Sequence, residues 1–256
     1  MFPKQRRKQI VEILKKEGSV KSDELAALFE VSVDSIRGDL RALDHEGVCN
    51  RVYGGATYIQ PKEETHVETF DINNVSEEDM GRLRVAKRAY MEINNGDSIF
   101  LDISRTNLLL ADILANGDKQ VIVTTNMIEV LPRLSKNPKI TALGTGGYLN
   151  MELNGLIGTA TISMLEPLLF AKAFIGVHGI DMTTQGVAAI EPDDGLVKQQ
   201  VLQNASYKFL LADSKKFKTP GNFRFATLTD FSAIISDTTD PEVIKKVAEL
   251  GIPLLR

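Results

Sequence analysis

The stretch VSVDSIRGDLRAL, residues 31–43, organises the first part of this chain. Ser32 is a suitable N-cap for a helix, because its hydroxyl can accept a hydrogen bond from an amide of the first turn. Apolar residues then recur with helical spacing, at Val33, Ile36, Leu40 and Leu43. The opposite face holds small, hydroxyl and charged residues, which are Asp34, Ser35, Arg37, Gly38 and Arg41. Such a helix could lie in the major groove of DNA, although the pattern is also typical of any surface helix.

The composition indicates a globular chain with an uneven charge distribution. Of the 256 residues, 43% are hydrophobic, which is enough for a core, and the length allows one large domain or two smaller ones. The formal net charge of −4 argues weakly against nucleic-acid binding. However, residues 1–60 hold ten Lys and Arg against nine Asp and Glu, whereas the remainder holds twenty against twenty-five. Four cations also lie within KQRRK, residues 4–8.

The sequence also argues against several classes of protein. The single cysteine, Cys49, excludes an internal disulfide and a cysteine-rich metal site. Because a charged segment follows Met1 at once, we expect no signal peptide. No apolar run reaches the length of a membrane span. We therefore expect a cytoplasmic protein with no membrane partner, no metal and no cofactor.

The first sixty residues predict three short helices followed by a hairpin. A helix is expected over residues 3–17, with Gly18 as its stop. Ser22 can cap a second helix, and the stretch after Ser32 forms the third. VCNRVYGGATY, residues 48–58, alternates and contains two adjacent glycines, which is typical of a hairpin or wing.

Three segments resemble the DeoR-type winged helix-turn-helix of bacterial sugar-metabolism regulators. They are RRKQIVEIL, SVKSDELAALFEVSVDSIRGDL and LDHEGVCNRVYGGA, in that order. The resemblance implies a DNA-binding domain over residues 3–58. The chain differs at Arg37-Gly38, where such sequences usually carry two adjacent arginines. A glycine inside a helix costs roughly 1 kcal/mol relative to alanine. The resemblance also implies that it removes a contact to a phosphate or a base.

By this resemblance, seven residues would contact double-stranded operator DNA, namely Arg6, Ser32, Ser35, Arg37, Arg41, Arg51 and Tyr53. Arg37 is the best candidate for reading a guanine edge, since a guanidinium can meet O6 and N7 together. Contact of Arg37 with a phosphate alone is the alternative. Lys4, Arg6, Arg7 and Lys8 would attract the DNA backbone, or they form a solvated helix end.

After a polar linker at residues 59–76, helices alternate with short apolar strands. Helices are expected at residues 77–92, 108–114, 128–134, 156–165, 195–205 and 241–251. Strands are expected at 98–104, 120–126, 139–149 (running into a glycine turn), 171–180, 207–214 and 232–237, and IPLL closes the chain. The alternation predicts an α/β domain over residues 77–256, with a mostly parallel sheet covered on both faces.

Distinctive residues follow five of these strands, at the edge where ligands bind to such sheets. They are Asp102 to Thr106, Thr124 to Asn126, Gly144 to Gly147, the pair Gly176 and Gly179, and Ala212 to Lys216. Hydroxyls, tight glycine turns and lysines on one rim suit an anion, above all a phosphate. Ordinary turn chemistry without a ligand is the alternative.

The same layout resembles the DeoR C-terminal sensor domain, which is similar in fold to phosphosugar isomerases. The resemblance implies a phosphorylated sugar or related metabolite as effector. Its contacts would be Asp102, Ser104, Arg105, Thr106, Thr125, Asn126, Gly146, Gly147, Lys198, Asp213 and Lys216. Ser104-Arg105-Thr106 stands where relatives usually have Gly-Thr-Thr, and Gly81-Arg82 stands where Glu and Lys are usual. The bulky Arg105 could block a phosphate there or pair with one.

Two alternatives to a metabolite-responsive regulator remain open. A phosphosugar isomerase or transferase would need a positioned acid or base, but the carboxylates of Asp102, Glu191, Asp193 and Asp194 form no recognisable catalytic pair. His178, flanked by a glycine at a strand end, is more often structural. In the second alternative, the sheet domain only oligomerises.

We predict a non-enzymatic transcriptional regulator, specifically a repressor of a carbohydrate-metabolism operon. One recognition helix buries too little surface for operator affinity, so a homo-oligomer of at least two chains is expected. Effector binding would shift the population between spacings of the paired DNA-binding domains.

Replacing Arg37 with alanine should sharply weaken operator binding and leave the fold intact, because Arg37 lies on the polar face of the helix. Gel-shift titration at fixed salt measures the binding. An unchanged affinity would remove Arg37 from the DNA site.

Overall fold

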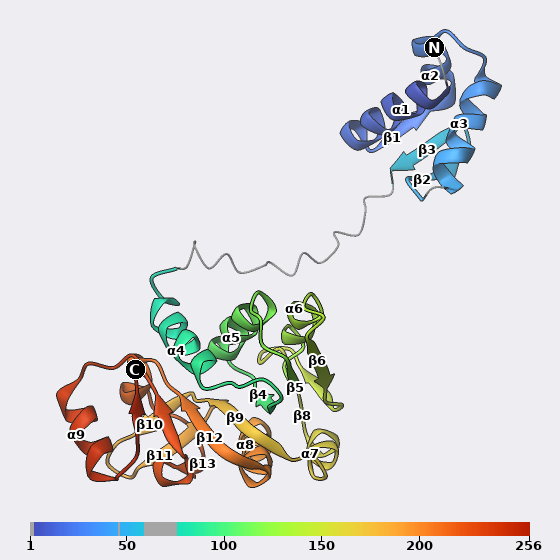
Figure 1. The fold of residues 1–256 in the computed structure, drawn as a ribbon. Coiled ribbons are helices and arrows are strands. Elements are labelled where there is room, and N and C mark those ends of the chain that lie inside the picture. The colour runs from blue at the N-terminus through green and yellow to red at the C-terminus, as the bar shows by residue number, and fades with distance from the viewer. Residues whose placement is uncertain (1–2, 46, 59–75) are drawn as a thin grey trace. The chain divides into compact units, whose positions relative to one another are not determined.

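The structure is a computed structural model that describes residues 3–45, 47–58 and 76–256. It divides into two compact units, residues 1–66 and 67–256 (Figure 1). The expected linker and short ordered piece at residues 59–75 lie outside the described residues. Within those residues, no helix is both long and apolar enough to cross a membrane.

The first unit consists of three helices and a three-stranded antiparallel sheet. Its elements are α1 (Pro3–Glu17), β1 (Ser19–Lys21), α2 (Ser22–Phe29), α3 (Val33–His45), β2 (Cys49–Val52) and β3 (Gly55–Tyr58). Strand β3 lies between β1 and β2, so β2 and β3 form the wing. The apolar stripe of α3 packs through Ile36, Leu40 and Leu43 against Ile10 and Leu14 of α1. This core holds α3 with its polar face outward.

The two expected caps have different outcomes. The amide of Ser35 donates to Oγ of Ser32 at 3.3 Å, so the predicted cap of α3 is confirmed. The predicted cap of α2 is wrong, because Ser22 is buried inside the first turn and Lys21 holds the capping position. Strand β1 pairs with β3 up to Lys21, which leaves Ser22 as the first helical residue.

The second unit is built on a seven-stranded parallel sheet, as the alternation of strands and helices predicted. The strand order is β15-β14-β12-β9-β4-β5-β6. The bounds are β4 (Ser98–Leu101), β5 (Val121–Thr125), β6 (Ile140–Gly144), β9 (Phe170–Gly176), β12 (Ala205–Leu211), β14 (Ala233–Ile235) and β15 (Leu254–Leu255). Each neighbouring pair in this order is parallel.

Helices cover both faces of this sheet, because successive strand residues point to opposite sides. In β4, Ile99 and Leu101 join one core cluster, whereas Phe100 joins the other. The first cluster includes α4 (Met80–Met91), α5 (Arg105–Ala115) and α6 (Val130–Leu134). The second includes α7 (Thr159–Leu165), α8 (Pro192–Asn204) and α9 (Pro241–Glu249).

Two smaller sheets differ from the expectation. Strands β7 (Tyr148–Asn150) and β8 (Gly155–Ile157) form a hairpin, so the helix predicted at 156–165 begins only at α7 and the glycine turn after β6 leads into a further strand. The single strand predicted at 171–180 is divided into β9 and β10 (Gly179–Asp181). Strand β10 belongs to an antiparallel sheet with β11 (Gly186–Ala189) and β13 (Phe223–Thr227), which was not predicted. Two short 3-10 helices, η1 (Ser214–Lys218) and η2 (Leu228–Asp230), complete the unit.

The order of the strands reverses beside β4. From β4 the chain adds β5 and β6 on one side, and then β9, β12, β14 and β15 on the other. The connections leaving β4 and β9 therefore diverge and open a crevice at their carboxyl ends. Such a reversal is where open α/β sheets bind ligands.

Candidate functional site

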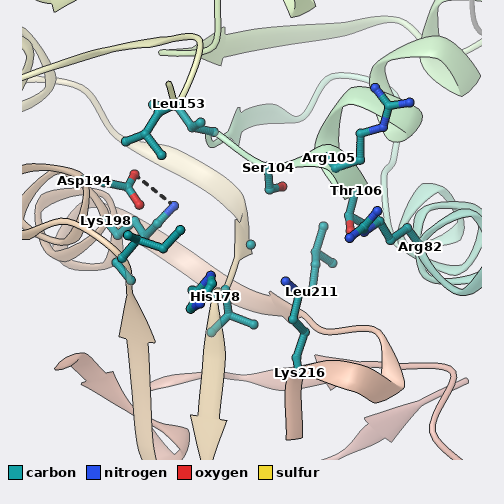
Figure 2. A pocket seen from close by; sticks show the side chains of 15 residues that line it. Arg82, Ser104, Arg105, Thr106, Leu153, His178, Asp194, Lys198, Leu211 and Lys216 are labelled. Atoms are coloured by element: carbon teal, nitrogen blue, oxygen red, sulfur yellow. Dashed lines mark ion pairs between the residues drawn. The ribbon is translucent and has the colours of Figure 1, made fainter. Parts of the chain in front are cut away.

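A cavity of about 140 Å³ lies at the carboxyl ends of β4 and β9 (Figure 2). It is lined by residues from the β4–α5 connection, the end of β9, α8, η1, α4 and the β7–β8 hairpin. The lining residues are Arg82, Ile103, Ser104, Arg105, Thr106, Leu153, Gly176, Val177, His178, Ala189, Ile190, Asp194, Lys198, Leu211 and Lys216. The cavity thus coincides with the reversal in strand order.

The N-terminus of α5 forms one wall of this cavity. Ser104 caps the helix, since its Oγ accepts a hydrogen bond from the amide of Asn107 at 3.1 Å. Gly176 lies beside it, where an added Cβ would be 2.3 Å from Cβ of Ser104, so only glycine lets β9 approach this closely. The first-turn amides and the helix dipole favour an anion at this wall.

Asp194 and Lys198 line another part of the cavity and form a buried group of three charges with Asp102. The ammonium of Lys198 pairs with Asp102, and it lies 3.2 Å from Oδ1 of Asp194. Burial lowers the pKa of Lys198, but the two carboxylates outweigh that effect and the net pKa is raised. Burial raises the pKa of Asp194. Lys198 therefore stays protonated, and its charge is already compensated inside the protein.

Lys216 and His178 also line the cavity, on its lower side in Figure 2. Burial lowers the pKa of Lys216, which the nearby carboxylate of Asp213 partly offsets. Burial also lowers the pKa of His178, and the positive charge of Lys216 adds to that effect. A neutral imidazole beside a half-buried ammonium can donate and accept hydrogen bonds next to a bound anion.

The structure brings together five of the eleven expected effector contacts. They are Ser104, Arg105, Thr106, Lys198 and Lys216. Asp102 and Asp213 lie just behind the lining, where Asp102 binds Lys198 and Asp213 caps η1. These two carboxylates would act by positioning the lining cations.

The remaining four expected contacts have other partners and do not line the cavity, although their strands end at the same edge of the sheet. Thr125 accepts a hydrogen bond from the amide of Met127, and the side-chain amide of Asn126 donates to the carbonyl of Leu156. The carbonyl of Gly146 accepts from Thr161, and a Cβ on Gly147 would be 2.0 Å from Oγ1 of Thr161. These residues fix the β7–β8 hairpin and α7.

Several lining residues were not predicted as contacts, and some left a signal in the sequence. Leu153 reaches the cavity from the β7–β8 hairpin, and Asn154-Gly155 is a turn dipeptide that could have indicated this hairpin. Arg82 and Ile190 reach it from segments distant in the chain. Their place depends on tertiary packing, which the local pattern does not specify.

In the first unit, six of the seven expected DNA contacts are exposed. They are Ser32, Ser35, Arg37, Arg41, Arg51 and Tyr53, from α3, the residue that caps it, and the wing. Arg37 donates to Oδ1 of Asp34 at 3.0 Å. The hydroxyls of Ser32 and Ser35 lie 2.9 Å apart and share a hydrogen bond. An added Cβ on Gly38 would meet no atom within 4 Å, so a side chain fits there.

The seventh residue, Arg6, differs from the expectation. Its guanidinium is buried and donates from Nε to Asp39 of α3 at 2.5 Å. Nε of Arg7 lies 3.6 Å from the other oxygen of the same carboxylate. Arg6 thus joins α1 to α3 and sets the position of α3, because its side chain is turned inward.

Comparison with known proteins agrees with both units. Residues 6–62 match the DeoR-like helix-turn-helix domain, and residues 78–238 match the DeoR C terminal sensor domain. The chain belongs to the DeoR family. It is therefore a transcriptional regulator with a helix-turn-helix DNA-binding domain, and we call its two units the DNA-binding domain and the sensor domain.

Relatives of this DeoR-family regulator match along nearly their whole length. YulB of Bacillus subtilis, an uncharacterized HTH-type transcriptional regulator, is 31% identical over 99% of this chain and 98% of its own. The lactose phosphotransferase system repressor of Lactococcus lactis is 31% identical over 85% of this chain and 84% of its own. The glycerol-3-phosphate regulon repressor of Escherichia coli is 26% identical over 95% of this chain and 94% of its own.

Among solved structures, ribose 5-phosphate isomerase A of Methanocaldococcus jannaschii matches with a TM-score of 0.40 at 20% identity. The match covers 56% of this chain and 55% of that one. A likeness this partial is not evidence of a shared reaction.

Replacing Arg6 with alanine should destabilise the DNA-binding domain by about 3 kcal/mol, because it removes a partner from the buried carboxylate of Asp39. Thermal unfolding of the full chain measures this effect. Lys8→Ala is the control, since Lys8 is exposed on the same helix and should leave the unfolding temperature unchanged. A loss of DNA affinity in Arg6→Ala without any loss of stability would contradict the structural role.

Proposed function

We propose that this regulator represses a carbohydrate-metabolism operon and that a phosphorylated sugar or related metabolite controls it. The DNA-binding domain recognises operator DNA through Ser32, Ser35, Arg37 and Arg41 around α3, and through Arg51 and Tyr53 of the wing. The sensor domain binds the effector in the cavity beside β4 and β9. The protein acts in the cytoplasm as a homo-oligomer of at least two chains, because a single recognition helix gives too little contact with DNA.

One observation carries the effector proposal, namely that the N-terminus of α5 faces Lys216 across the cavity. Amides at a helix N-terminus and a lysine are a common pair of ligands for a phosphate. Ser104 and Thr106 add hydroxyls at the same wall, and the cavity lies at the expected ligand position of the sheet. The names of two relatives, which refer to a lactose phosphotransferase system and to glycerol 3-phosphate, support the same class of metabolite.

The charge arrangement favours binding over catalysis. Asp194 lines the cavity but is paired with Lys198, and Asp102 is occupied by the same ammonium. A general base needs a carboxylate or imidazole that can take a proton from the substrate. His178 could do so, but it lies beside Lys216 at a place suited to hold an anion. We therefore propose a sensor without enzymatic activity.

The experiment has two steps. A DNA sequence selected by the full chain from a random library is first used in gel-shift titrations, and triose, pentose and hexose phosphates are then added. At least one of them should change the DNA affinity about tenfold or more, which corresponds to a typical coupling free energy. Silence of the whole panel, with intact specific DNA binding, would favour a sensor domain that only oligomerises. Turnover of a phosphosugar would favour an enzyme.

Lys216→Ala should abolish the response to the active phosphosugar and leave DNA binding intact, because it removes a cation from the cavity. Lys215→Ala is the matched control, since Lys215 is the exposed neighbour on the same 3-10 helix. An equal loss of response in both variants would show that general positive charge, and not the cavity, is responsible.

A further inference from the structure

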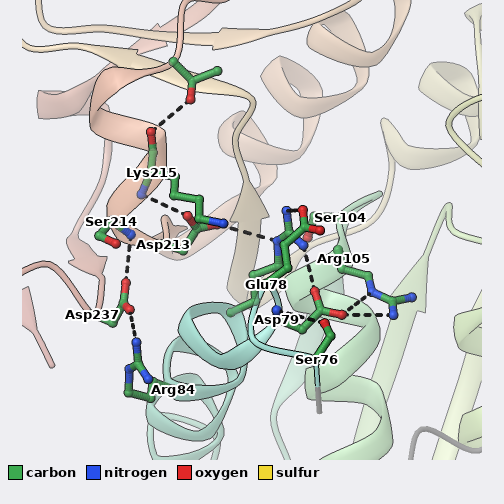
Figure 3. A network of polar contacts seen from close by, with 12 residues as sticks. Ser76, Glu78, Asp79, Arg84, Ser104, Arg105, Asp213, Ser214, Lys215 and Asp237 are labelled. Atoms are coloured by element: carbon green, nitrogen blue, oxygen red, sulfur yellow. Dashed lines mark hydrogen bonds and ion pairs between the residues drawn. The ribbon is translucent and has the colours of Figure 1, made fainter.

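Each lysine or arginine that lines the effector cavity already has a carboxylate beside it. Lys198 has Asp102 and Asp194, and Lys216 is close to Asp213. Arg82 and Arg105 share Asp79, which is not among the lining residues. Figure 3 shows Asp79 beside Arg105. An anion that enters the cavity therefore has to compete with one of these internal carboxylates for its cation.

Asp79 divides its two oxygens between the two arginines. Oδ1 accepts from Nη1 of Arg82 at 2.7 Å. Oδ2 accepts from Nη2 of Arg105 at 3.1 Å and from its Nε at 3.3 Å. Burial raises the pKa of Asp79, but the hydrogen bonds from Arg82 and Arg105 outweigh it and the net pKa is lowered. The carboxylate is thus ionised, and its charge depends on these arginines.

Two other internal carboxylates, those of Asp102 and Asp213, are tied to the fold by additional bonds. Asp102 accepts from the backbone amide of Gly176 and from the side chain of Asn107. Asp213 accepts from the amide of Lys215 as the cap of η1. The hydrogen bonds that the structure gives to the carboxylate of Asp79 come from Arg82 and Arg105. Asp194 pairs with Lys198, which is buried and also held by Asp102. Asp79 is therefore the carboxylate whose cation an incoming anion can take with less disruption than at Asp102 or Asp213.

Arg105 is the cation best placed to change partner. It is the first residue of α5, next to the cap Ser104, and 48% of its side chain is exposed. Its guanidinium now points away from His178 and Lys216 (Figure 2). A rotation of this side chain toward the cavity would add a bidentate guanidinium, beside Lys216, to an anion at the start of α5.

The start of α4 is coupled to this exchange. The amide of Asp79 donates to the carbonyl and hydroxyl oxygens of Ser76, the first described residue of the sensor domain, and the amide of Leu83 donates to the carbonyl of Asp79. Without Arg105, one of the two oxygens of the buried Asp79 carboxylate loses its positively charged partner. A buried charge without a partner is costly, so the carboxylate has to move toward water. Movement of Asp79 would loosen the first turn of α4, directly after the segment that leads from the DNA-binding domain.

We propose that Asp79 is an internal competitor of the anionic effector, which takes Arg105 from it and thereby loosens the start of α4. The inference rests on the proposed effector site and adds how occupancy of that site reaches the chain segment before α4. It also gives a role to Arg105, the first residue of α5.

Calorimetric titration of the full chain with inorganic phosphate tests the competition. Asp79→Asn keeps the shape of the side chain and removes its charge, so phosphate should bind about tenfold more tightly than to the wild type. Glu77→Gln is the control, because it removes the same charge from an exposed position two residues away and should leave the affinity unchanged. Arg105→Gln should weaken phosphate binding.

Hydrogen exchange of backbone amides in the wild-type chain provides a second readout, which does not depend on whether a variant folds. Phosphate should accelerate exchange of the amides at residues 80–84, although it slows exchange at the start of α5. Equal phosphate affinities for Asp79→Asn and Glu77→Gln, or unchanged or slower exchange at residues 80–84, would overturn the inference alone. If neither phosphate nor any phosphosugar bound to the wild type and to Asp79→Asn, the proposed effector site would fail together with the inference.

Discussion

The buried carboxylate of Asp102 is the contact on which the sensor domain depends most. It follows β4 and accepts hydrogen bonds from the amide of Gly176 at the end of β9, from Asn107 of α5 and from Lys198 of α8. One charged group therefore joins both sides of the strand-order reversal to the helices above it. An intact buried ion pair adds little stability, but the loss of one partner is strongly destabilising. Asp102 therefore holds β4, β9, α5 and α8 in fixed relative positions.

The DNA-binding domain uses the same physical device on a smaller scale. Asp39 is buried in α3 and holds Arg6 from α1, so an ionic contact sets the position of the recognition helix. In both domains, cations that a sequence pattern assigns to a ligand are first occupied by internal carboxylates. The cations best placed for ligands are the more accessible ones, such as Arg37 on the exposed face of α3 and Lys216 in the cavity, although each also lies near a carboxylate.

The local sequence was sufficient wherever burial followed a simple period. The stripe of α3, its cap Ser32 and the alternating strands predicted the winged domain and the parallel sheet correctly. The local sequence gave wrong predictions where contacts between distant segments determine the position of a side chain. Arg6 lies in a run of surface-like cations, and only its approach to Asp39 turns it inward. Gly146 and Gly147 follow strand β6, just as the cavity residues follow β4 and β9. However, β6 is an edge strand, and β5 separates it from the reversal between β4 and β9.

The central claim is that an anion binds between the start of α5 and Lys216. A crystal structure of the full protein with a phosphosugar that changes its DNA affinity tests this most directly. The account predicts phosphate oxygens within about 3 Å of Oγ of Ser104 or the first amides of α5, and of Nζ of Lys216. A phosphate bound at any other place on the sensor domain, with this cavity unchanged, would contradict it.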